Sequence, residues 1–390
     1  MHRIVILGAG YAGMAAAMQL GARTRRRSDV EITLVNATER FTERLRLPMA
    51  ATGQDLAELD IPTMLSGTGV HFVRGWVTAV DPGARVVRID DRQTLDFTTL
   101  VYALGSVADT ASVPGAEEYA YPLDGPAEAA QLVSNIKSAG TVVIGGNGLT
   151  GIESAAEIAS RYPGKRVVLL GRDEPGAKMA AKPRAYLQAA LRRLGVEDRH
   201  GVEIAEVLPG AVRLEGGETL PADVFLWAAG TRVPVLAEGL GTDERGRVVT
   251  DASLRSVTHP HVYAAGDAAA VRQPYGIMHG TCQGGMPTGV HAAISIVREL
   301  NGKAPKPFRF GYYHTPVSLG RHDGVVQFTH GDDTPRRFHL TGRMAARYKE
   351  SVTAAPWPAY RRMRSMPASA RSGRTASGRS AHERSRRGPG

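Results

Sequence analysis

The sequence predicts an α/β fold with two separate parallel-sheet units, because one strand–turn–helix–strand pattern occurs twice along its 390 residues. In both copies an apolar run ends in closely spaced glycines and leads into a segment of helical periodicity. The chain length fits two or three domains, and the hydrophobic fraction of 43% supplies enough apolar residues for more than one core.

The first copy begins at the N-terminus. Residues 4–7 (IVIL) form the predicted strand, GAGYAG follows, and residues 31–35 (EITLV) form the returning strand. In such a unit Gly8 makes the tight turn, Gly10 lets the backbone approach a pyrophosphate, and Gly13 lets the helix pack close to the strand. The helix N-terminus offers free N–H groups to the phosphates, so this copy predicts a Rossmann-like dinucleotide-binding domain.

The second copy repeats the first. Residues 141–146 (TVVIGG) form the strand, residues 165–171 (KRVVLLG) form the returning strand, and a helix lies between them. Gly146, Gly148 and Gly151 take the three glycine roles. Two dinucleotides in one chain suggest hydride transfer from a nicotinamide to a flavin.

The ends of the two returning strands differ from the usual pattern, in which an acidic residue holds a ribose. Asn36 stands at this place in the first copy, and its amide can hydrogen-bond hydroxyl groups. Gly171 stands there in the second copy, followed by Arg172, which could pair with a 2′-phosphate, while Asp173 and Glu174 could instead reach the ribose. We therefore expect NADPH to be used at least as well as NADH.

Three later segments fit the same scheme. VYAAGD places Gly266 and Asp267 after a short strand-like run, and the connectors TLVYALGS (99–106) and DVFLWAAGTRVP (223–234) contain Gly105 and Gly230. With the two glycine motifs in this order, the chain resembles the FAD- and NAD(P)-dependent oxidoreductases with two dinucleotide-binding domains. It is most similar to the type II, single-subunit NADH dehydrogenases.

The resemblance implies that FAD and NAD(P)H are the cofactors. It also implies an interleaved layout, in which the NAD(P) domain (residues 111–234) is inserted into the FAD domain. The FAD domain then consists of a first segment, residues 1–110, and a second segment, residues 235–300. A small C-terminal region (301–355) and a basic, disordered tail (356–390) are expected to follow.

The resemblance also assigns roles to single residues. Asp267 is expected to hydrogen-bond the ribityl-phosphate region of FAD, with Gly105, Gly230 and Gly266 also at the cofactors. Glu153 corresponds to a glutamate near the nicotinamide and flavin rings, although a carboxylate in the first turn of a helix also stabilises the helix dipole without any catalytic role.

The segment 279–300 reads as a loop that enters a helix whose N-terminus points at the flavin in this family. Gln283 matches the first glutamine of the AQxAxQ quinone motif of the type II enzymes, whereas Pro287 replaces the second. We expect Glu153 and Gln283 to be the catalytic residues.

These features predict an FAD-dependent NAD(P)H dehydrogenase that passes electrons to a quinone-like or other small-molecule acceptor. Two alternatives stay open at this stage: a reductase of a small electron-carrier protein, and a non-catalytic redox sensor that holds FAD and NAD(P). The sequence does not determine the oligomeric state.

Composition excludes several other classes. The single cysteine, Cys282, allows no internal disulfide and no CxxC pair, and we expect it to pack against the flavin rather than act as a nucleophile. The histidines show no metal-ligand spacing, so no metal is expected. Residues 361–390 carry nine arginines and one glutamate, which is most of the net charge of +10, but they lack a nucleic-acid-binding module.

The expected location is cytoplasmic, since neither a signal peptide nor a spanning helix is recognisable. In WPAYRRMRSM (357–366) Trp357, Tyr360, Met363 and Met366 stand three residues apart, with arginines between them. Such a helix would suit peripheral contact with the inner face of a membrane, and a packed terminal helix explains the same residues equally well.

Overall fold

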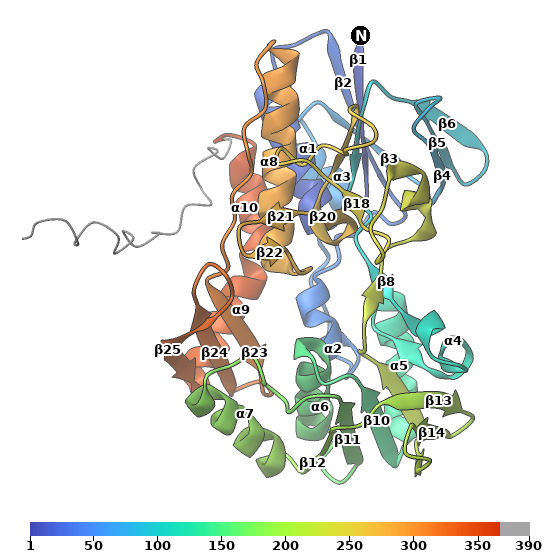
Figure 1. Cartoon of the computed structure of the whole chain (residues 1–390), viewed down its shortest axis with the longest axis vertical. Helices are drawn as coiled ribbons and strands as arrows, with labels where there is room; N and C mark the ends of the chain where they lie inside the picture. The colour runs from blue at the N-terminus through green and yellow to red at the C-terminus, as the bar shows by residue number, and fades with distance from the viewer. Residues whose placement is uncertain (367–390) are drawn as a thin grey trace, which may run out of the picture.

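The structure is a computed structural model that describes residues 1–366. It consists of two α/β units joined by a narrow connection, with a smaller C-terminal region along one side (Figure 1). The predicted fold class is confirmed, because each unit is built on a five-stranded sheet whose strands all run parallel.

The sheet of the first unit combines early and late parts of the chain. In spatial order its strands are β19 (Val262–Ala264), β7 (Thr99–Tyr102), β1 (His2–Leu7), β2 (Val30–Asn36) and β3 (Val70–Arg74). The strand β19 therefore completes this sheet by pairing with β7, which lies some 160 positions earlier in the chain. This is the interleaving that the resemblance implies, while the proposed domain boundaries themselves stay predictions.

The sheet of the second unit lies entirely within the insert. Its strands are, in order, β12 (Val196–His200), β11 (Arg166–Gly171), β10 (Thr141–Gly145), β16 (Val224–Trp227) and β9 (Tyr121–Pro122). The central strands of both sheets are buried on both faces, as the continuous apolar runs in their sequences require.

Each unit carries a three-stranded antiparallel sheet just before one of its core strands, β7 in the first unit and β16 in the second. The sheet before β7 contains β4 (Val77–Asp81), β5 (Val86–Ile89) and β6 (Gln93–Asp96), and the one before β16 contains β13 (Ile204–Leu208), β14 (Ala211–Leu214) and β15 (Thr219–Pro221). The duplication thus extends beyond the glycine motifs.

The two chain crossings between the units run side by side. The short strands β8 (Val107–Ala108) and β17 (Thr231–Arg232) pair antiparallel, and they follow β7 and β16, respectively. Paired crossings fix the two units relative to each other more firmly than two separate linkers would.

The helices that cover the sheets begin with α1 (Tyr11–Thr24) and α6 (Leu149–Arg161), which follow the two glycine motifs. The long helix α8 (Cys282–Leu300) packs along α1. Gly289 permits this approach, because a Cβ at that position would lie 2.0 Å from the carbonyl oxygen of Ala12. The others are α2 (Leu47–Ala50), α3 (Ile61–Leu65), α4 (Ala116–Tyr119), α5 (Pro126–Ser138) and α7 (Ala181–Arg193).

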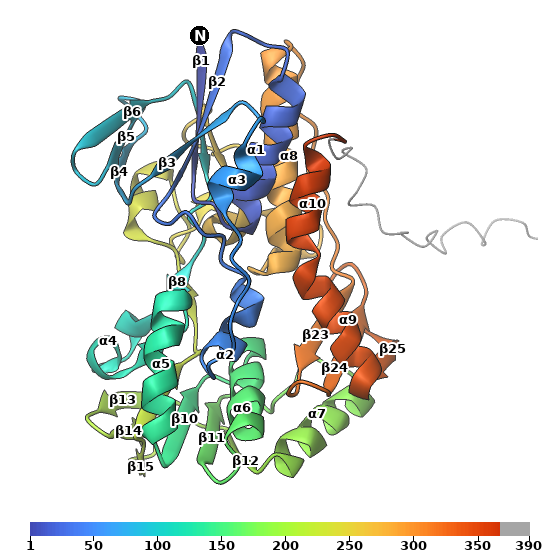
Figure 2. The ribbon, with the colours of Figure 1, turned by 180° about the vertical axis from the view of Figure 1, so that it is seen from behind.

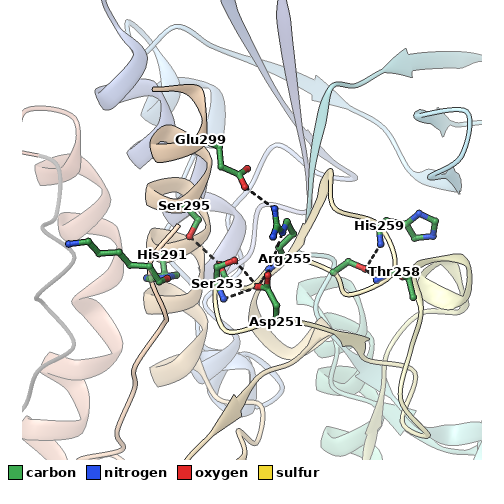
Figure 3. Close-up of polar contacts among 10 residues, drawn as sticks. Asp251, Ser253, Arg255, Thr258, His259, His291, Ser295 and Glu299 are labelled. Carbon is green, nitrogen blue, oxygen red and sulfur yellow. Dashed lines mark hydrogen bonds and ion pairs between the residues drawn. The ribbon is translucent and has the colours of Figure 1, made fainter. Parts of the chain in front are cut away.

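Figure 3 shows how the C-terminal part of α8 is tied to the loop before β19. The guanidinium of Arg255 pairs with Glu299 at 3.1 Å, and the Ser295 hydroxyl donates to the carbonyl oxygen of Ser253 at 3.2 Å. Asp251 organises the same loop, since its Oδ1 accepts hydrogen bonds from the backbone N–H groups of Ser253 and Arg255. These contacts fix the far end of α8 and hence the position of its N-terminus.

The C-terminal region contains β23 (His314–Ser318), β24 (Gly324–Thr329) and β25 (Pro335–Thr341) in one antiparallel sheet, followed by α9 (Gly342–Ala354) and α10 (Pro356–Met363). Figure 2 shows α10 beside α1. The remaining short strands are β18 (Val248–Val249), β20 (Ala269–Ala270), β21 (Arg272–Gln273) and β22 (Gly276–Ile277).

The helix α10 uses its apolar residues for packing within the protein. Tyr360 is fully buried and donates a hydrogen bond to the carbonyl oxygen of Tyr11 at 3.0 Å, while Trp357 contacts Phe41 with ring centroids 5.5 Å apart. Packing against α1 and Phe41 therefore accounts for Trp357 and Tyr360, two of the residues whose spacing also suited a membrane-surface helix. No helix within residues 1–366 is both long and apolar enough to cross a membrane.

The predicted tail begins later than expected, because residues 356–363 form α10. The rest of the predicted tail, from residue 367 onward, lies outside the described residues.

The glycine motifs give a direct test of the fold. A Cβ on Gly13 would lie 1.8 Å from the carbonyl oxygen of Gly8, whereas a Cβ on Gly10 would meet no atom within 4 Å. Alanine at position 13 should therefore lower the free energy of unfolding by about 1–3 kcal/mol, although Gly→Ala inside a helix normally stabilises by up to about 1 kcal/mol. Thermal unfolding should show no comparable loss for Gly10→Ala, and equal stabilities of the two variants would contradict the proposed close approach.

Candidate active site between the two glycine loops

The two glycine loops have the geometry that dinucleotide binding requires. Gly8 and Gly146 adopt left-handed backbone conformations, with φ of 91° and 107°, at the ends of β1 and β10. Gly10 and Gly148 are the N-caps of α1 and α6, and neither helix start has a side-chain cap. The first N–H groups of both helices are thus left for a ligand.

The same positions leave room for that ligand. A Cβ on Gly10 or on Gly148 would meet nothing within 4 Å, so the backbone at both points faces open space. A Cβ on Gly151 would lie 1.8 Å from the carbonyl oxygen of Gly146, which repeats the contact of Gly13 with Gly8. The structure thus brings each predicted set of three glycines together, and each set fits a pyrophosphate.

In each unit an asparagine ties the glycine loop to the end of the second strand. In the first unit Asn36 Oδ1 accepts a hydrogen bond from the N–H of Ala9 at 2.9 Å, and its Nδ2 donates to the carbonyl oxygen of Thr38 at 2.8 Å. Asn36 therefore holds the loop in place, and its proposed contact with a ribose stays a prediction.

In the second unit the asparagine comes from the loop instead of the strand. Asn147 lies between Gly146 and Gly148 and donates from Nδ2 to the carbonyl oxygen of Asp173. A Cβ on Gly171 would lie 2.0 Å from Cγ of Asn147. The side chain of Asn147 thus leaves no room for a carboxylate side chain at position 171, which the sequence analysis missed. An asparagine inside the glycine loop, together with a glycine at the end of the strand, could have indicated this contact.

Arg172 lies at the surface beside this loop. Its guanidinium pairs with Glu203 at 3.1 Å, and 77% of its side chain is exposed. An exposed ion pair of this kind contributes little to stability, so the guanidinium can exchange its partner for a ligand phosphate at small cost.

A second group of predicted residues meets at the carboxyl ends of β7 and β19, the edge at which parallel sheets bind ligands. The Ser106 hydroxyl donates to Asp267 Oδ2 at 3.0 Å, and the backbone N–H of Gly266 donates to the hydroxyl of Thr288 on α8 at 2.9 Å. Gly105 has a φ of 71° beside Ser106. Gly230, in contrast, lies in the other connector, where its carbonyl oxygen accepts from the N–H of Asp109 at 3.3 Å.

Glu153 is buried in the first turns of α6, with 7% of its side chain exposed. Its Oε1 lies 2.8 Å from the ammonium nitrogen of Lys349 on α9 and accepts a hydrogen bond from the N–H of Ser318 at 2.8 Å. The sequence analysis missed Lys349, because nothing in the pattern of α9 distinguishes it from a surface lysine. The pair joins the second unit to the C-terminal region.

Gln283 is held by both ends of its carboxamide. Its Nε2 donates to the carbonyl oxygen of His314 at 3.0 Å, and its Oε1 accepts from the N–H of Tyr313 at 3.1 Å. His314 shares a hydrogen bond of 2.7 Å with the hydroxyl of Tyr348. Burial, together with the nearby charge of Lys349, lowers the pKa of His314 to about 4, so its ring is neutral near pH 7.

Cys282 is the first residue of α8 and packs against the core of the first unit. Burial raises the pKa of its thiol to about 11, which keeps it protonated and unreactive near pH 7. Thr281 is the N-cap of α8, and its hydroxyl accepts a hydrogen bond from the N–H of Gly284 at 3.2 Å. Residues 1–366 contain no group of three acidic, histidine or cysteine side chains that could hold a metal ion.

A cavity of about 530 Å³ opens beside the buried ion pair. Leu45 and Met49 line it from the segment around α2, Glu153 from α6, and Ser318 and Lys349 from the C-terminal region. Elements from three parts of the chain therefore enclose one space next to Glu153.

A model of the pyridine nucleotide-disulphide oxidoreductases matches residues 2–295. The chain belongs to this family.

Among similar proteins, an NADH dehydrogenase-like protein of Mycobacterium tuberculosis is 32% identical, with 90% of this chain and 93% of that protein covered. A type II NADH:quinone oxidoreductase of Staphylococcus aureus is 29% identical over 83% of this chain and 89% of its own length. The solved structure of NDH2 from Plasmodium falciparum in complex with NADH is similar in fold, with a TM-score of 0.76, 14% identity and coverage of 93% and 97%.

The family membership confirms the predicted relationship and makes the protein an oxidoreductase. The chain differs from what the family's name suggests, because Cys282 is its only cysteine and no disulphide can form within it. Electron transfer in this member of the pyridine nucleotide-disulphide oxidoreductases must therefore proceed without an internal dithiol.

The Glu153–Lys349 pair gives a stability prediction. Methionine at position 349 keeps much of the aliphatic volume but leaves the buried carboxylate without a cation, which typically costs about 3–5 kcal/mol. We expect the free energy of unfolding, measured by denaturant titration, to fall by that amount. Adding Glu153→Gln should restore most of it, because glutamine needs no cation and still accepts from Ser318. An unchanged Lys349→Met variant would contradict the proposed pair.

Proposed function

We propose that the protein is an FAD-dependent NAD(P)H dehydrogenase that reduces a quinone-like acceptor. The observation that carries this proposal is the duplication of the glycine loop, with an uncapped helix N-terminus behind each loop. One such loop would suit any dinucleotide-binding protein, but two in an oxidoreductase suit a flavin and a nicotinamide that exchange a hydride.

Different residues would then hold the different parts of the two cofactors. Gly8, Gly10 and Gly13 receive the pyrophosphate of FAD, and Asp267, oriented by Ser106, holds the ribityl-phosphate region. Gly146, Gly148 and Gly151 receive the nicotinamide nucleotide. When bound, the flavin supplies the capacity to take up a hydride and release two electrons to another molecule.

The acceptor would bind in the cavity of about 530 Å³ beside Glu153 and Lys349. Gln283 keeps its proposed role at the site. It would act by holding the backbone of residues 313–314, because both ends of its carboxamide are hydrogen-bonded there and neither is free for a ligand. A cytoplasmic location and peripheral membrane contact stay predictions from the sequence.

The two loops allow a paired test of this assignment. Valine at position 10 should abolish FAD binding, and valine at position 148 should leave FAD bound but abolish flavin reduction by NAD(P)H, because each side chain fills the space of one pyrophosphate. Flavin content of the purified variants and anaerobic bleaching of the flavin measure the two effects. Wild-type protein should also turn over NAD(P)H with a soluble quinone such as menadione.

The assignment would be wrong if wild-type protein cannot be loaded with FAD, or if Gly148→Val loses the flavin while Gly10→Val keeps it. Turnover of NAD(P)H without any quinone reduction would indicate another acceptor.

Nucleotide preference is a separate prediction. We expect NADPH to be used at least as well as NADH, since the second unit has no strand-end carboxylate to repel a 2′-phosphate. Arg172→Ala should lower kcat/KM for NADPH about two- to fivefold and leave NADH nearly unchanged, because an exposed charge pair is worth at most about 1 kcal/mol.

Arg166→Ala is the matched control. Arg166 also pairs with a glutamate at the surface, but at the opposite end of β11. A kcat/KM for NADH more than about ten times that for NADPH, or equal losses in both arginine variants, would contradict the assignment to Arg172.

A further inference from the structure

Glu157 is a buried acid that the proposed hydride chemistry does not use. Only 3% of its surface is exposed, and it lies on α6 four residues after Glu153, on the same face of the helix. Its carboxylate accepts a hydrogen bond from the side chain of Gln54. Unlike Glu153, it forms no ion pair with any residue in the described part of the chain.

Glu157 borders two neighbouring cavities. It lines the acceptor cavity of about 530 Å³ together with Glu153, and it also lines a cavity of about 700 Å³ that shares the residues 320–322 and Arg343 with the first. Exposed side chains border both cavities, for example Arg193 at the larger one and Arg347 at the acceptor cavity, so solvent reaches both. The loop between β23 and β24, with Arg321, also borders both. Glu157 is therefore a buried carboxyl beside the proposed acceptor site, at the junction of two cavities that solvent can enter.

The proposed reaction needs a proton from solvent. In the net reaction NAD(P)H and quinone take up one proton and give NAD(P)⁺ and quinol. The hydride provides both electrons and one of the two hydrogens of the quinol, so the second hydrogen must enter as a proton. An acid positioned beside the acceptor can deliver that proton as the acceptor is reduced.

The surroundings of Glu157 suit a group that holds a proton. Burial raises the pKa of its carboxyl most strongly, and the charge of Glu153 acts in the same direction, while Arg321, Gln54 and Arg161 oppose the shift. The charged or titratable groups that line the two cavities with it are Arg46, Glu153, Arg161, Tyr186, Arg193, Arg321, His322, Asp323, Arg343, Arg347, Lys349 and Glu350.

We propose that Glu157 delivers this proton to the acceptor beside Glu153. This inference rests on the proposed function. The O–H bond of the Glu157 carboxyl breaks and a new O–H bond forms on the reduced acceptor, by way of water or the Glu153 carboxylate in the shared cavity. Glu157 then regains a proton from solvent in the larger cavity, and no further oxidant or reductant is needed.

The test compares an acceptor that needs protons with one that does not. In anaerobic stopped-flow experiments, the flavin of Glu157→Gln is first reduced with NAD(P)H and then reoxidised by menadione or by ferricyanide, which takes up electrons alone. We expect reoxidation by menadione to slow at least tenfold and reoxidation by ferricyanide to stay within twofold of wild type. Glu157→Asp should recover part of the menadione rate.

Equal slowing with both acceptors would overturn the proposal, because it would assign Glu157 a structural role. Unchanged rates with both would overturn it as well. Failure of the proposed dehydrogenase function would look different from failure of the Glu157 proposal. In the first case the flavin of the wild type would not be reduced by NAD(P)H or would not be reoxidised by menadione.

A second measurement does not depend on activity. An acid whose pKa is raised in the folded state contributes stability below its unfolded pKa, and that contribution is lost as pH rises through the folded pKa. As the pH rises above the ordinary pKa range of a glutamate side chain, the free energy of unfolding of the wild type should therefore fall relative to that of Glu157→Gln. Denaturant titrations of both proteins at several pH values would measure this difference. A stability difference that does not change with pH would overturn the proposal.

Discussion

The close approach of a helix to the turn before it determines most of the other features. In both units a glycine in the first turns of the helix lies against the carbonyl oxygen of the glycine that ends the first strand, where a Cβ would lie 1.8 Å from that oxygen. This contact directs the helix N-terminus at the end of the sheet and leaves its N–H groups uncapped. The phosphate-binding geometry is therefore a consequence of backbone packing and needs no charged side chain.

The relative placement of the two units depends on contacts between distant parts of the chain. The strand β19 and the helix α8 return to the first unit after the insert, and Gly289 lets α8 lie against α1. The C-terminal region then reaches the second unit through Lys349 and Ser318, which both contact Glu153. The cavity beside Glu153 exists because these three parts meet there.

The sequence was informative where local backbone geometry admits one residue type. Gly8, Gly13, Gly146 and Gly151 could be predicted because turns and close helix packing exclude side chains at those positions. The two parallel sheets followed from the apolar runs before the glycines. The family resemblance, which rested on these motifs and on Asp267, is confirmed by the match over residues 2–295.

The features that the sequence did not reveal depend on tertiary contacts. Lys349 pairs with Glu153 only because the C-terminal region folds back onto α6, and both groups of the Gln283 carboxamide are used by the backbone of residues 313 and 314. Asn147 explains Gly171 through a side-chain contact that no periodicity encodes. Trp357 and Tyr360 had the spacing of a surface helix, and only packing against α1 shows their role.

The central claim is that two dinucleotides meet in this chain and exchange a hydride. The most direct test is anaerobic flavin reduction at saturating nicotinamide nucleotide, with the transferred hydrogen on C4 replaced by deuterium. We predict that the flavin bleaches in a single phase and that the deuterated nucleotide bleaches it more slowly, because the C–H bond breaks in that step. Absence of bleaching, or equal rates with both nucleotides, would contradict direct hydride transfer.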